Sequence, residues 1–481
     1  MPDLLPVRLQ NILHNCKPKL RKERLGRVKV IHCFTIKSRN LVLDVESGAL
    51  HQVSDVAMKV IASVKESANL LSEIDAPSEI LEEINALIQG GMLFSRPSGE
   101  VVHEHMTNRK PVIKALCMHM AHECNLRCRY CFAGEGNYSL TDRGFMSLEV
   151  GKKALDFLVE SSGSRRNLEV DFFGGEPMMN FDVVKELVAY GRSLEEKAGK
   201  KFRFTLTTNG VLLTDDAIEY INQNMDNVVL SLDGRQHVND RMRRNHNGGG
   251  SYEQIFPRIK KLADARQHQN YYVRGTFTRF NMDFAADVLH LADAGFKNIS
   301  VEPVVAPKDE VFALRGGVEL KILFEEYEHL ASELLKREKQ GKGILFFHFE
   351  MNLDGGPCIA KRVTGCGAGS EYLAVTPSGK LYPCHQFVGD ERFQIGDLTK
   401  GTEITHNEFT QDFQNCHVYA KPECAKCWAR YYCSGGCMAT AYYANDSILK
   451  PDEISCELMR KRIECALYIF AERRELNGGA F

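Results

Sequence analysis

Two hydrophobic patterns follow one another along the chain, and the first is short. Near the start, three brief apolar runs separated by polar turns predict strands at Val30–Phe34, Asn40–Val45 and Gly48–Val53. Apolar residues three and four positions apart then predict helices at Val56–Val64 and Ile80–Ile88. Three strands followed by helices in so short a segment predict a winged-helix-like module at residues 30–105.

Beyond Pro111 a strand, a loop and a helix repeat. Strands are predicted at Ile113–Met120, Leu168–Phe173, Phe202–Thr208, Asn227–Leu232, Tyr271–Thr278 and Asn298–Pro303. Helices are predicted at Ser147–Glu160, Phe181–Ala198, Asp215–Asn224, Tyr252–Ala265, Asp283–Ala294 and Leu320–Lys339. Six β/α units call for an α/β fold, in which a parallel sheet has its helices packed outside. We assign this second domain to residues 111–340.

The two ends of the chain lack these patterns. Residues 1–29 are rich in lysine and arginine, which predicts a solvated basic extension. From Gly355 onward cysteines, glycines and short hairpins dominate. This composition predicts that residues 355–475 form a domain organised by metal rather than by a hydrophobic core.

The composition limits the cellular compartment and the binding partners that we expect for this protein. The formal net charge of −2 gives no electrostatic reason to bind nucleic acid. No run of 18 apolar residues occurs, so we expect no membrane span, and the first thirty residues lack a secretory signal. Sixteen cysteines without an export signal indicate metal or redox use. We therefore expect a cytoplasmic protein of an anaerobic bacterium, since oxygen destroys exposed low-potential clusters.

The most informative motif is Cys124-x3-Cys128-x2-Cys131. It follows the first predicted strand of the parallel sheet, at the carboxyl end where such sheets place their sites. Three thiolates at this spacing can hold three irons of a 4Fe–4S cluster, which leaves the fourth iron free for a small molecule. A zinc knuckle is the alternative, although zinc normally needs four protein ligands.

Three more motifs end later strands of the same sheet. Gly174-Gly175-Glu176-Pro177 follows the second strand, Thr207-Thr208-Asn209-Gly210 the third and Ser231-Leu232-Asp233-Gly234 the fourth. Two adjacent glycines allow the backbone to turn and to approach a ligand closely. Each motif alone is weak evidence, but their order on successive strand ends indicates one site.

Together with Tyr130 before the third cysteine, these motifs resemble the radical S-adenosylmethionine (SAM) superfamily. The resemblance implies a partial (β/α)6 barrel whose Cys124, Cys128 and Cys131 hold a 4Fe–4S cluster. It implies that SAM lies among Tyr130, Gly174, Gly175, Glu176, Pro177, Thr208, Asn209, Ser231 and Asp233, with Arg243 or Arg274 facing its carboxylate. A reduced cluster of this family cleaves SAM to a 5′-deoxyadenosyl radical, which removes hydrogen from an unactivated carbon inside a dry cavity.

The later cysteines resemble those of the SPASM domain, which carries two auxiliary 4Fe–4S clusters and would bring the total to three. By the family pattern, an outer set comprises Cys424, Cys427, Cys433 and Cys456, and an inner set comprises Cys366, Cys384 and Cys437. Cys358 either completes the inner cluster or leaves an open iron that binds a substrate thiolate. A structural zinc pair is the alternative.

The remaining cysteines and the histidines near the motifs have ordinary interpretations. We expect buried apolar thiols at Cys16, Cys33, Cys117, Cys416 and Cys465. For Cys416 the alternative is a helper near the inner cluster. We expect His119, His122 and His385 to form ordinary hydrogen bonds rather than metal bonds. The turn Pro377-Ser378-Gly379 predicts a hairpin that presents Cys384.

The N-terminal module resembles a peptide-recognition element, because a short sheet with a free edge can accept an extended peptide as an added strand. A plain winged-helix scaffold is the alternative. Four stretches narrow the resemblance, at residues 40–51, 384–389, 421–428 and 432–437. They are similar to the SCIFF-type (ranthipeptide) maturases, which install thioether cross-links in cysteine-rich precursor peptides. Only the basic extension departs from that family.

This resemblance implies two partners. One is a precursor peptide whose leader docks on the N-terminal module, and the other is a flavodoxin- or ferredoxin-type electron donor. The rival enzymes are an anaerobic sulfatase-maturating type that forms formylglycine and a maturase that forms carbon–carbon cross-links. A non-catalytic iron–sulfur electron carrier is a rival from another class, but it leaves the Gly-Gly-Glu-Pro motif without a purpose.

Overall fold

The computed structural model describes residues 30–67, 71–96, 112–138, 144–351, 359–404 and 408–476. The predicted basic extension, Cys16, Cys358 and residues 97–105 of the predicted module lie outside these ranges. Within them, no helix combines the length and the apolar character needed to cross a membrane.

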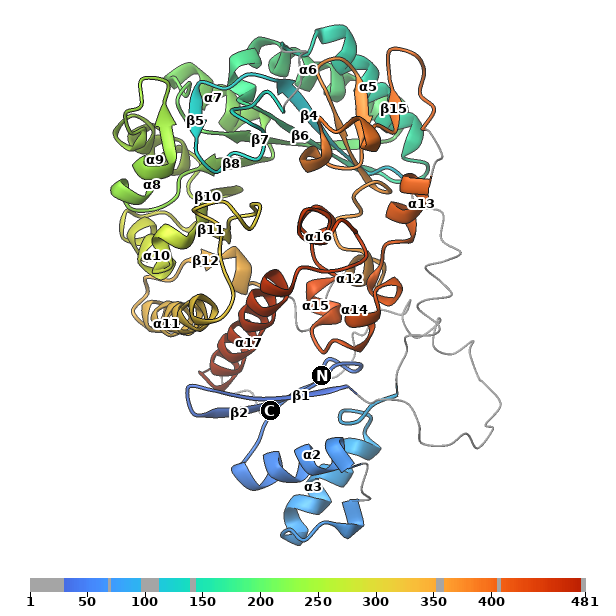
Figure 1. Cartoon of the computed structure of the whole chain (residues 1–481). Coiled ribbons are helices and arrows are strands. Elements are labelled where there is room, and N and C mark those ends of the chain that lie inside the picture. The colour runs from blue at the N-terminus through green and yellow to red at the C-terminus, as the bar shows by residue number, and fades with distance from the viewer. Residues whose placement is uncertain are drawn as a thin grey trace.

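A sheet of ten strands forms the centre of the molecule (Figure 1). All six predicted strands lie next to one another in it and run parallel. They are β4 (Ala115–Ala121), β6 (Asn167–Gly174), β7 (Lys201–Thr208), β8 (Asn227–Ser231), β10 (Tyr271–Phe277) and β11 (Asn298–Pro303). The short β12 (Leu345–Phe346) extends the sheet beyond β11. The predicted α/β fold with a parallel sheet is therefore confirmed.

Helices cover the outer side of this curved sheet (Figure 1). They are α5 (Leu148–Ser161), α6 (Phe181–Ala198), α7 (Asp215–Asn224), α8 (Gln236–Met242), α9 (Tyr252–Ala265), α10 (Phe284–Asp293) and α11 (Val318–Lys339). Alternation along each strand explains the layers. In β7, Phe202, Phe204 and Leu206 are fully buried, while the residues between them face the other side. The apolar side packs on helices, which leaves the inner side for chemistry.

The C-terminal domain shares this sheet. Strand β13 (Tyr372–Val375) runs parallel to β4, and β14 (Lys380–Tyr382) and β15 (Gly396–Asp397) continue the sheet from it. The predicted hairpin is present, because Gly379 turns the chain between β13 and β14 with a φ of 86°. Cys384 follows β14 and begins a short 3-10 helix, His385–Phe387.

The expectation that the C-terminal region lacks a hydrophobic core is wrong. Phe387, Phe393 and Phe413 are buried together there with Tyr382. These aromatic residues are irregularly spaced between the cysteines, so they give no periodic signal in the sequence. The helices of the region are α12 (Ile359–Thr364), α13 (Glu408–Asn415), α14 (Pro422–Lys426), α15 (Arg430–Cys433), α16 (Met438–Asn445) and α17 (Glu453–Leu476). The long α17 packs against α11.

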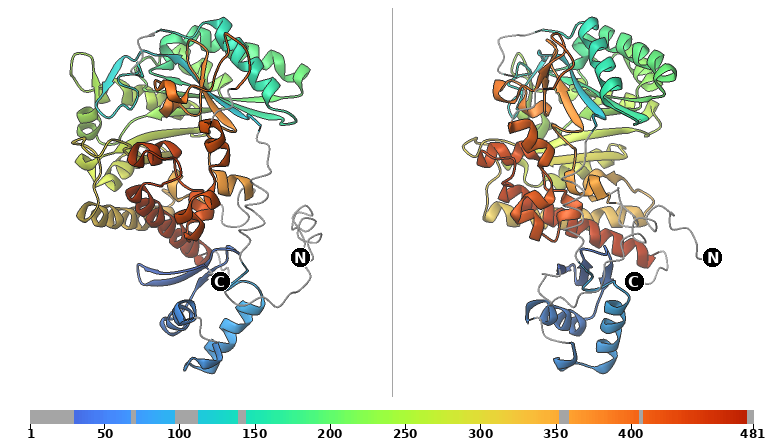
Figure 2. Two further views of the ribbon diagram at one scale, coloured as in Figure 1. Left: turned by 45° about the vertical axis from the view of Figure 1, so that its right-hand side comes forward. Right: turned by 90° about the vertical axis from the view of Figure 1, so that its right-hand side faces the viewer.

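The N-terminal module lies at one end of the molecule in every view (Figures 1 and 2). Its antiparallel sheet has the order β1 (Ile31–Ile36), β2 (Arg39–Asp44), β3 (Leu50–Gln52). Helices α2 (Asp55–Ser67) and α3 (Ser78–Gln89) close a small core against one face. The other face joins the main core, and β1 contacts α17. The module is therefore fixed to the C-terminal domain.

Candidate active site

The first cysteine set lies on the loop after β4. A two-stranded ribbon, β5 (Leu126–Cys128) with β9 (Arg243–Asn245), anchors the loop, and Cys128 lies opposite Arg243 in it. Burial raises the pKa of the Cys128 thiol to about 12. Burial also raises the pKa of the Cys124 thiol, to which nearby Glu176, Cys128 and Cys131 add. Such buried thiols become thiolates when a metal supplies positive charge, so this donor set fits an iron–sulfur cluster.

The spacing of the described thiols bears on which metal group they could hold. In the described ranges, no three His, Cys, Asp or Glu side chains come together closely enough to hold one ion. Zinc needs its ligands to converge on one point. A 4Fe–4S cluster binds each thiolate through a different iron, so its ligands stand further apart.

The glycines after β6 pack directly on the start of the cysteine loop. The Gly175 amide donates to the Ala121 carbonyl at 2.8 Å, and the Glu176 amide donates to the Glu123 carbonyl at 2.9 Å. A Cβ atom on Gly175 would lie 2.1 Å from the Glu123 carbonyl oxygen, and one on Gly174 would lie 2.4 Å from that of Ala121. Only glycine permits this backbone contact, which places the motif beside Cys124.

Glu176 ties the ends of β6 and β7 together. Its carboxylate accepts hydrogen bonds from Thr208 Oγ1 and the Asn209 amide, both at 2.8 Å, and from the Met178 amide at 3.0 Å. Burial raises the Glu176 pKa to about 7. Asn209 Nδ2 in turn donates to Asn125 Oδ1 at 2.7 Å. The predicted SAM residues on these two strands thus meet at the cysteine loop, with Pro177 beginning the short 3-10 helix that follows.

Asp233 connects β8 to the cysteine loop. Its Oδ1 accepts from Arg243 Nε at 3.1 Å and from the Thr276 amide at 3.0 Å. Tyr130 donates its hydroxyl to Asp233 Oδ2 at 2.7 Å. Asp233 and Arg243 are buried, and Tyr130 is paired with Asp233, so these contacts position the loop. Of the two predicted arginines, Arg243 is held here.

Arg274, the other predicted arginine, lies on the inner side of β10. It is paired with Ser231 of β8 in the strand register, and its Nη2 donates to Glu302 Oε2 at 2.5 Å. The Arg274 side chain is 49% exposed. Arg274 therefore lies at a solvent-accessible position on the inner side of the sheet.

An aromatic chamber lies on the inner side of β4 and β6, and the sequence indicated its three histidines but not Tyr138 or Phe173. His119 Nδ1 and His122 Nε2 are 3.1 Å apart, and both rings contact Tyr138. Phe173 and His385 contact at 5.1 Å between ring centroids. His119 Nε2 and the Tyr138 hydroxyl are buried, and neither has a hydrogen-bond partner among the described residues. Alternation along β4 could have indicated that His119 faces inward, whereas Tyr138 carries no sequence signal.

Tyr138 lies near thiols of both cysteine sets, because Cys131 and Cys384 pack against the same buried cluster. Burial raises the pKa of Tyr138, and the nearby thiols of Cys117, Cys131, Cys124 and Cys384 add to the rise. His385 has the hydrogen-bond contact expected of it, because its Nδ1 lies 3.1 Å from the Tyr372 hydroxyl. The chamber thus joins the cysteine loop to the inner set.

The inner set consists of Cys366, Cys384 and Cys437. Burial raises the Cys384 pKa, and both other thiols are near enough to add to the rise. Cys384 Sγ accepts from the Gln386 amide at 3.5 Å. Cys366 and Cys437 are exposed. Three thiols with accessible space beside them fit three corners of a cluster.

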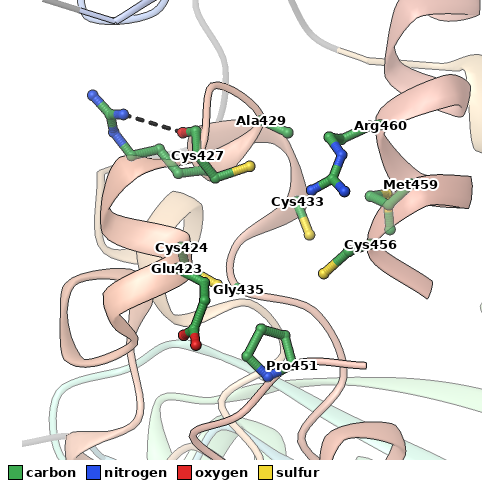
Figure 3. Close-up of a pocket in the computed structure, with 11 residues that line it drawn as sticks. Glu423, Cys424, Cys427, Ala429, Cys433, Gly435, Pro451, Cys456, Met459 and Arg460 are labelled. Atoms are coloured by element: carbon green, nitrogen blue, oxygen red, sulfur yellow. Dashed lines mark hydrogen bonds between the residues drawn. The ribbon is translucent and has the colours of Figure 1, made fainter. Parts of the chain in front are cut away.

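The outer set surrounds one pocket (Figure 3). Figure 3 shows the thiols of Cys424, Cys427, Cys433 and Cys456 turned toward a common space, with Arg460 beside them. They come from α14 and the residue that follows it, from α15 and from α17, so residues more than thirty positions apart converge. Burial raises the pKa of Cys424 to about 12 and that of Cys456 to about 11. Four thiols around one cavity match the four ligands of a 4Fe–4S cluster.

The other described cysteines are mostly packing residues. Cys117 and Cys465 are fully buried, as predicted, and Cys33 is partly buried. Cys416 is also buried, and its thiol donates to the Ile448 carbonyl at 3.7 Å. It lies near Cys366 of the inner set and near Lys421.

Comparison with known proteins adds two domain matches. Residues 118–292 match the Radical SAM superfamily. Residues 366–428 match SPASM, an iron–sulfur cluster-binding domain. The first match contains the cysteine loop and the strand-end motifs. The second begins at Cys366 and contains Cys384, Cys424 and Cys427.

Two curated relatives match this chain over most of their own length. The radical SAM cyclopropyl synthase TigE of Paramaledivibacter caminithermalis is 23% identical over 88% of this chain and 92% of its own. The cysteine-type anaerobic sulfatase-maturating enzyme of Clostridium novyi is 24% identical over 65% of this chain and 84% of its own.

Solved structures show the same fold. The enzyme anSMEcpe with bound AdoMet superposes with a TM-score of 0.61, at 20% identity, over 74% of this chain and 98% of its own. Streptococcus suis SuiB bound to its precursor peptide SuiA superposes with a TM-score of 0.50, at 13% identity, over 88% of this chain and 98% of its own.

Proposed function

We propose that this chain, in which a radical SAM domain precedes an iron–sulfur cluster-binding SPASM domain, installs thioether cross-links in a cysteine-rich, ribosomally made precursor peptide. The observation that carries the proposal is the aromatic chamber around Tyr138. Tyr138 packs in one buried cluster with Cys131 of the cysteine loop and Cys384 of the inner set, which supports a short path between the two sets. A substrate sulfur held at one side would face the radical generated at the other.

The cysteine loop and the motifs around it would hold the reactive cluster and SAM. When bound, the cluster and SAM supply a 5′-deoxyadenosyl radical that removes a hydrogen atom from the peptide. Glu176 and Asn209 hold the strand ends against the loop, and the Tyr130–Asp233–Arg243 network holds its other side. Their role in the proposal is to fix the geometry of the loop.

The chamber would protect the reaction. His119 contacts the rings of Tyr138 and Phe173, and these packed rings would keep water away from a reactive intermediate. The unpartnered His119 Nε2 and Tyr138 hydroxyl offer two polar points that a peptide backbone can use. The rings thus give a dry pocket with a small number of fixed polar contacts.

The inner set would bind the substrate thiolate. Three thiols are brought together, and Cys366 and Cys437 stand at accessible positions. A fourth ligand from the peptide would keep the sulfur beside the chamber. Forming one thioether from a thiol and a C–H bond releases one hydrogen atom to the radical, one proton and one electron. The auxiliary clusters would accept that electron.

The leader of the peptide would bind the N-terminal module. Strand β1 is covered by α17, and His32 on it stacks on Trp428 at 3.6 Å between ring centroids. Strand β3 pairs with β2 alone within the described residues. An extended leader could therefore add to β3, where its backbone would complete the hydrogen bonds of a free edge.

The test is the mass of a cysteine-rich precursor peptide after anaerobic incubation with the reconstituted enzyme, reductant and SAM. Thioether formation predicts the loss of one hydrogen pair and one alkylatable thiol per link. Formylglycine formation would remove sulfur, and carbon–carbon cross-linking would keep every thiol, so either result would contradict the proposal. The same peptide without its leader should react much more slowly if the module recognises the leader.

A further inference from the structure

Lys421 places a buried positive charge inside the C-terminal domain. It directly precedes α14 and is 2% exposed. Its Nζ donates a hydrogen bond to the Gly435 carbonyl at 2.9 Å. Gly435 stands between Cys433 of the outer set and Cys437 of the inner set. The ammonium group therefore lies where the two sets adjoin.

The surroundings of this ammonium are thiols. The charge of Lys421 acts on the Cys416 thiol, and Cys416 lies near Cys366 of the inner set. On its other side, the charge of Lys421 acts on Cys424 of the outer set. No Asp or Glu in the described part of the chain forms an ion pair with Lys421.

A buried ammonium without a carboxylate is unfavourable unless another negative charge faces it. A 4Fe–4S cluster with four thiolate ligands carries net negative charge, and each electron it accepts adds to that charge. A fixed cation beside it stabilises the reduced form more than the oxidised form. The effect is strong here because little water reaches Lys421.

We infer that Lys421 is a positioning residue that raises the reduction potential of the outer cluster, so that an electron arriving at the inner cluster moves outward. The direction of electron flow rests on the proposed function, whereas the effect on potential does not. Gly435, which accepts the hydrogen bond from Lys421, lines the pocket that the outer thiols surround, and the charge of Lys421 also acts on Cys424. Toward the inner set, the charge acts on Cys416, which is expected to be no ligand. The outer cluster should therefore respond more.

The experiment is a potentiometric titration followed by electron paramagnetic resonance on the full chain. Cys124, Cys128 and Cys131 are replaced by Ala in every sample, so that only auxiliary clusters contribute. Lys421→Gln keeps a hydrogen-bond donor for Gly435 and removes the charge, and Lys421→Arg keeps the charge. We expect Lys421→Gln to make reduction of the outer cluster about tenfold less favourable, which is about 59 mV for one electron. Lys421→Arg should stay close to the parent.

Lys426 is the matched control. It is exposed on the same helix and directly precedes Cys427, so solvent screens its charge. Lys426→Gln should leave both potentials unchanged. An unchanged outer potential in Lys421→Gln, or an equal shift in Lys426→Gln, would overturn the inference.

The iron and sulfide content of the variants distinguishes an electrostatic role of Lys421 from a purely structural one. If Lys421→Gln and Lys421→Arg both lose the outer cluster by iron and sulfide analysis, the role of Lys421 is structural and the inference fails. Loss in Lys421→Gln with retention in Lys421→Arg would support it. These measurements need no peptide, so a failed cross-linking assay would remove only the proposed function.

Discussion

Glu46 of the N-terminal module and Arg430 of the C-terminal domain form an ion pair with side chains that are 4% and 3% exposed. Arg430 also donates from Nη1 to the Cys427 carbonyl at 3.1 Å. The turn after β2 is therefore connected through one guanidinium to the loop of the outer cysteine set. A substitution of either partner should therefore affect the stability of both domains.

Glu46→Ala should destabilise the protein by about 3–5 kcal/mol, because it leaves the Arg430 charge buried without its partner. Thermal unfolding followed by circular dichroism, with iron analysis, measures this. Glu475, which pairs with Arg39 at 2.6 Å but is 54% exposed, is the control. Glu475→Ala should cost at most about 1 kcal/mol. Equal effects of the two variants would show that the buried pair has no special role.

Gly175→Ala should strongly weaken SAM binding. The added Cβ would lie 2.1 Å from the Glu123 carbonyl oxygen, so the cysteine loop must shift. We expect at least a hundredfold weaker SAM binding by isothermal titration, which is about 2.7 kcal/mol. Gly316 has open space around its Cβ position, so Gly316→Ala should bind SAM normally. Normal SAM binding by Gly175→Ala would contradict the packing described for this motif.

Tyr130→Phe and Asp233→Asn should separate two interactions that hold the cysteine loop in place. Tyr130→Phe removes one hydrogen bond to a carboxylate, worth about 1.5–3 kcal/mol. Asp233→Asn also leaves buried Arg243 without its ion pair and should weaken SAM binding further. In Asp233→Asn the iron content should fall by the amount that one cluster contributes, while the electron paramagnetic resonance signals of the auxiliary clusters remain. Loss of every cluster would instead indicate global unfolding.

Asp171 on the inner side of β6 should make stability depend on pH. Burial raises its pKa from 3.8 to about 7, against the opposing effects of Thr207 and Arg274. Because the folded state favours the protonated form, its stabilising contribution is complete below the unfolded pKa and is lost as the pH rises through about 7. From pH 6 to pH 8, the wild type should lose about 1.4 kcal/mol relative to Asp171→Asn. Denaturant unfolding at the two pH values measures the difference, and parallel curves would contradict the assignment.

The parts of this protein that could be predicted from the sequence are those determined by residues close together along the chain. Strand ends, glycine motifs and cysteine spacings are local, so six strands and the cysteine loop follow from them. The Glu46–Arg430 pair joins residues 384 positions apart, and no local pattern indicates it. Tyr138 and Lys421 gain their importance only from what the fold places around them. The C-terminal core was missed because its aromatic residues follow no period.

The pairing of β13 with β4 limits how such enzymes can be recombined in the laboratory. A cut between residues 340 and 355 looks like a natural boundary, because the composition changes there. Yet β4 lies between β6 and β13, so removing the C-terminal half would expose the backbone of the strand that precedes the cysteine loop. Free strand edges invite aggregation. Chimeras that exchange the C-terminal half should therefore retain the native β13 and join the new sequence after it.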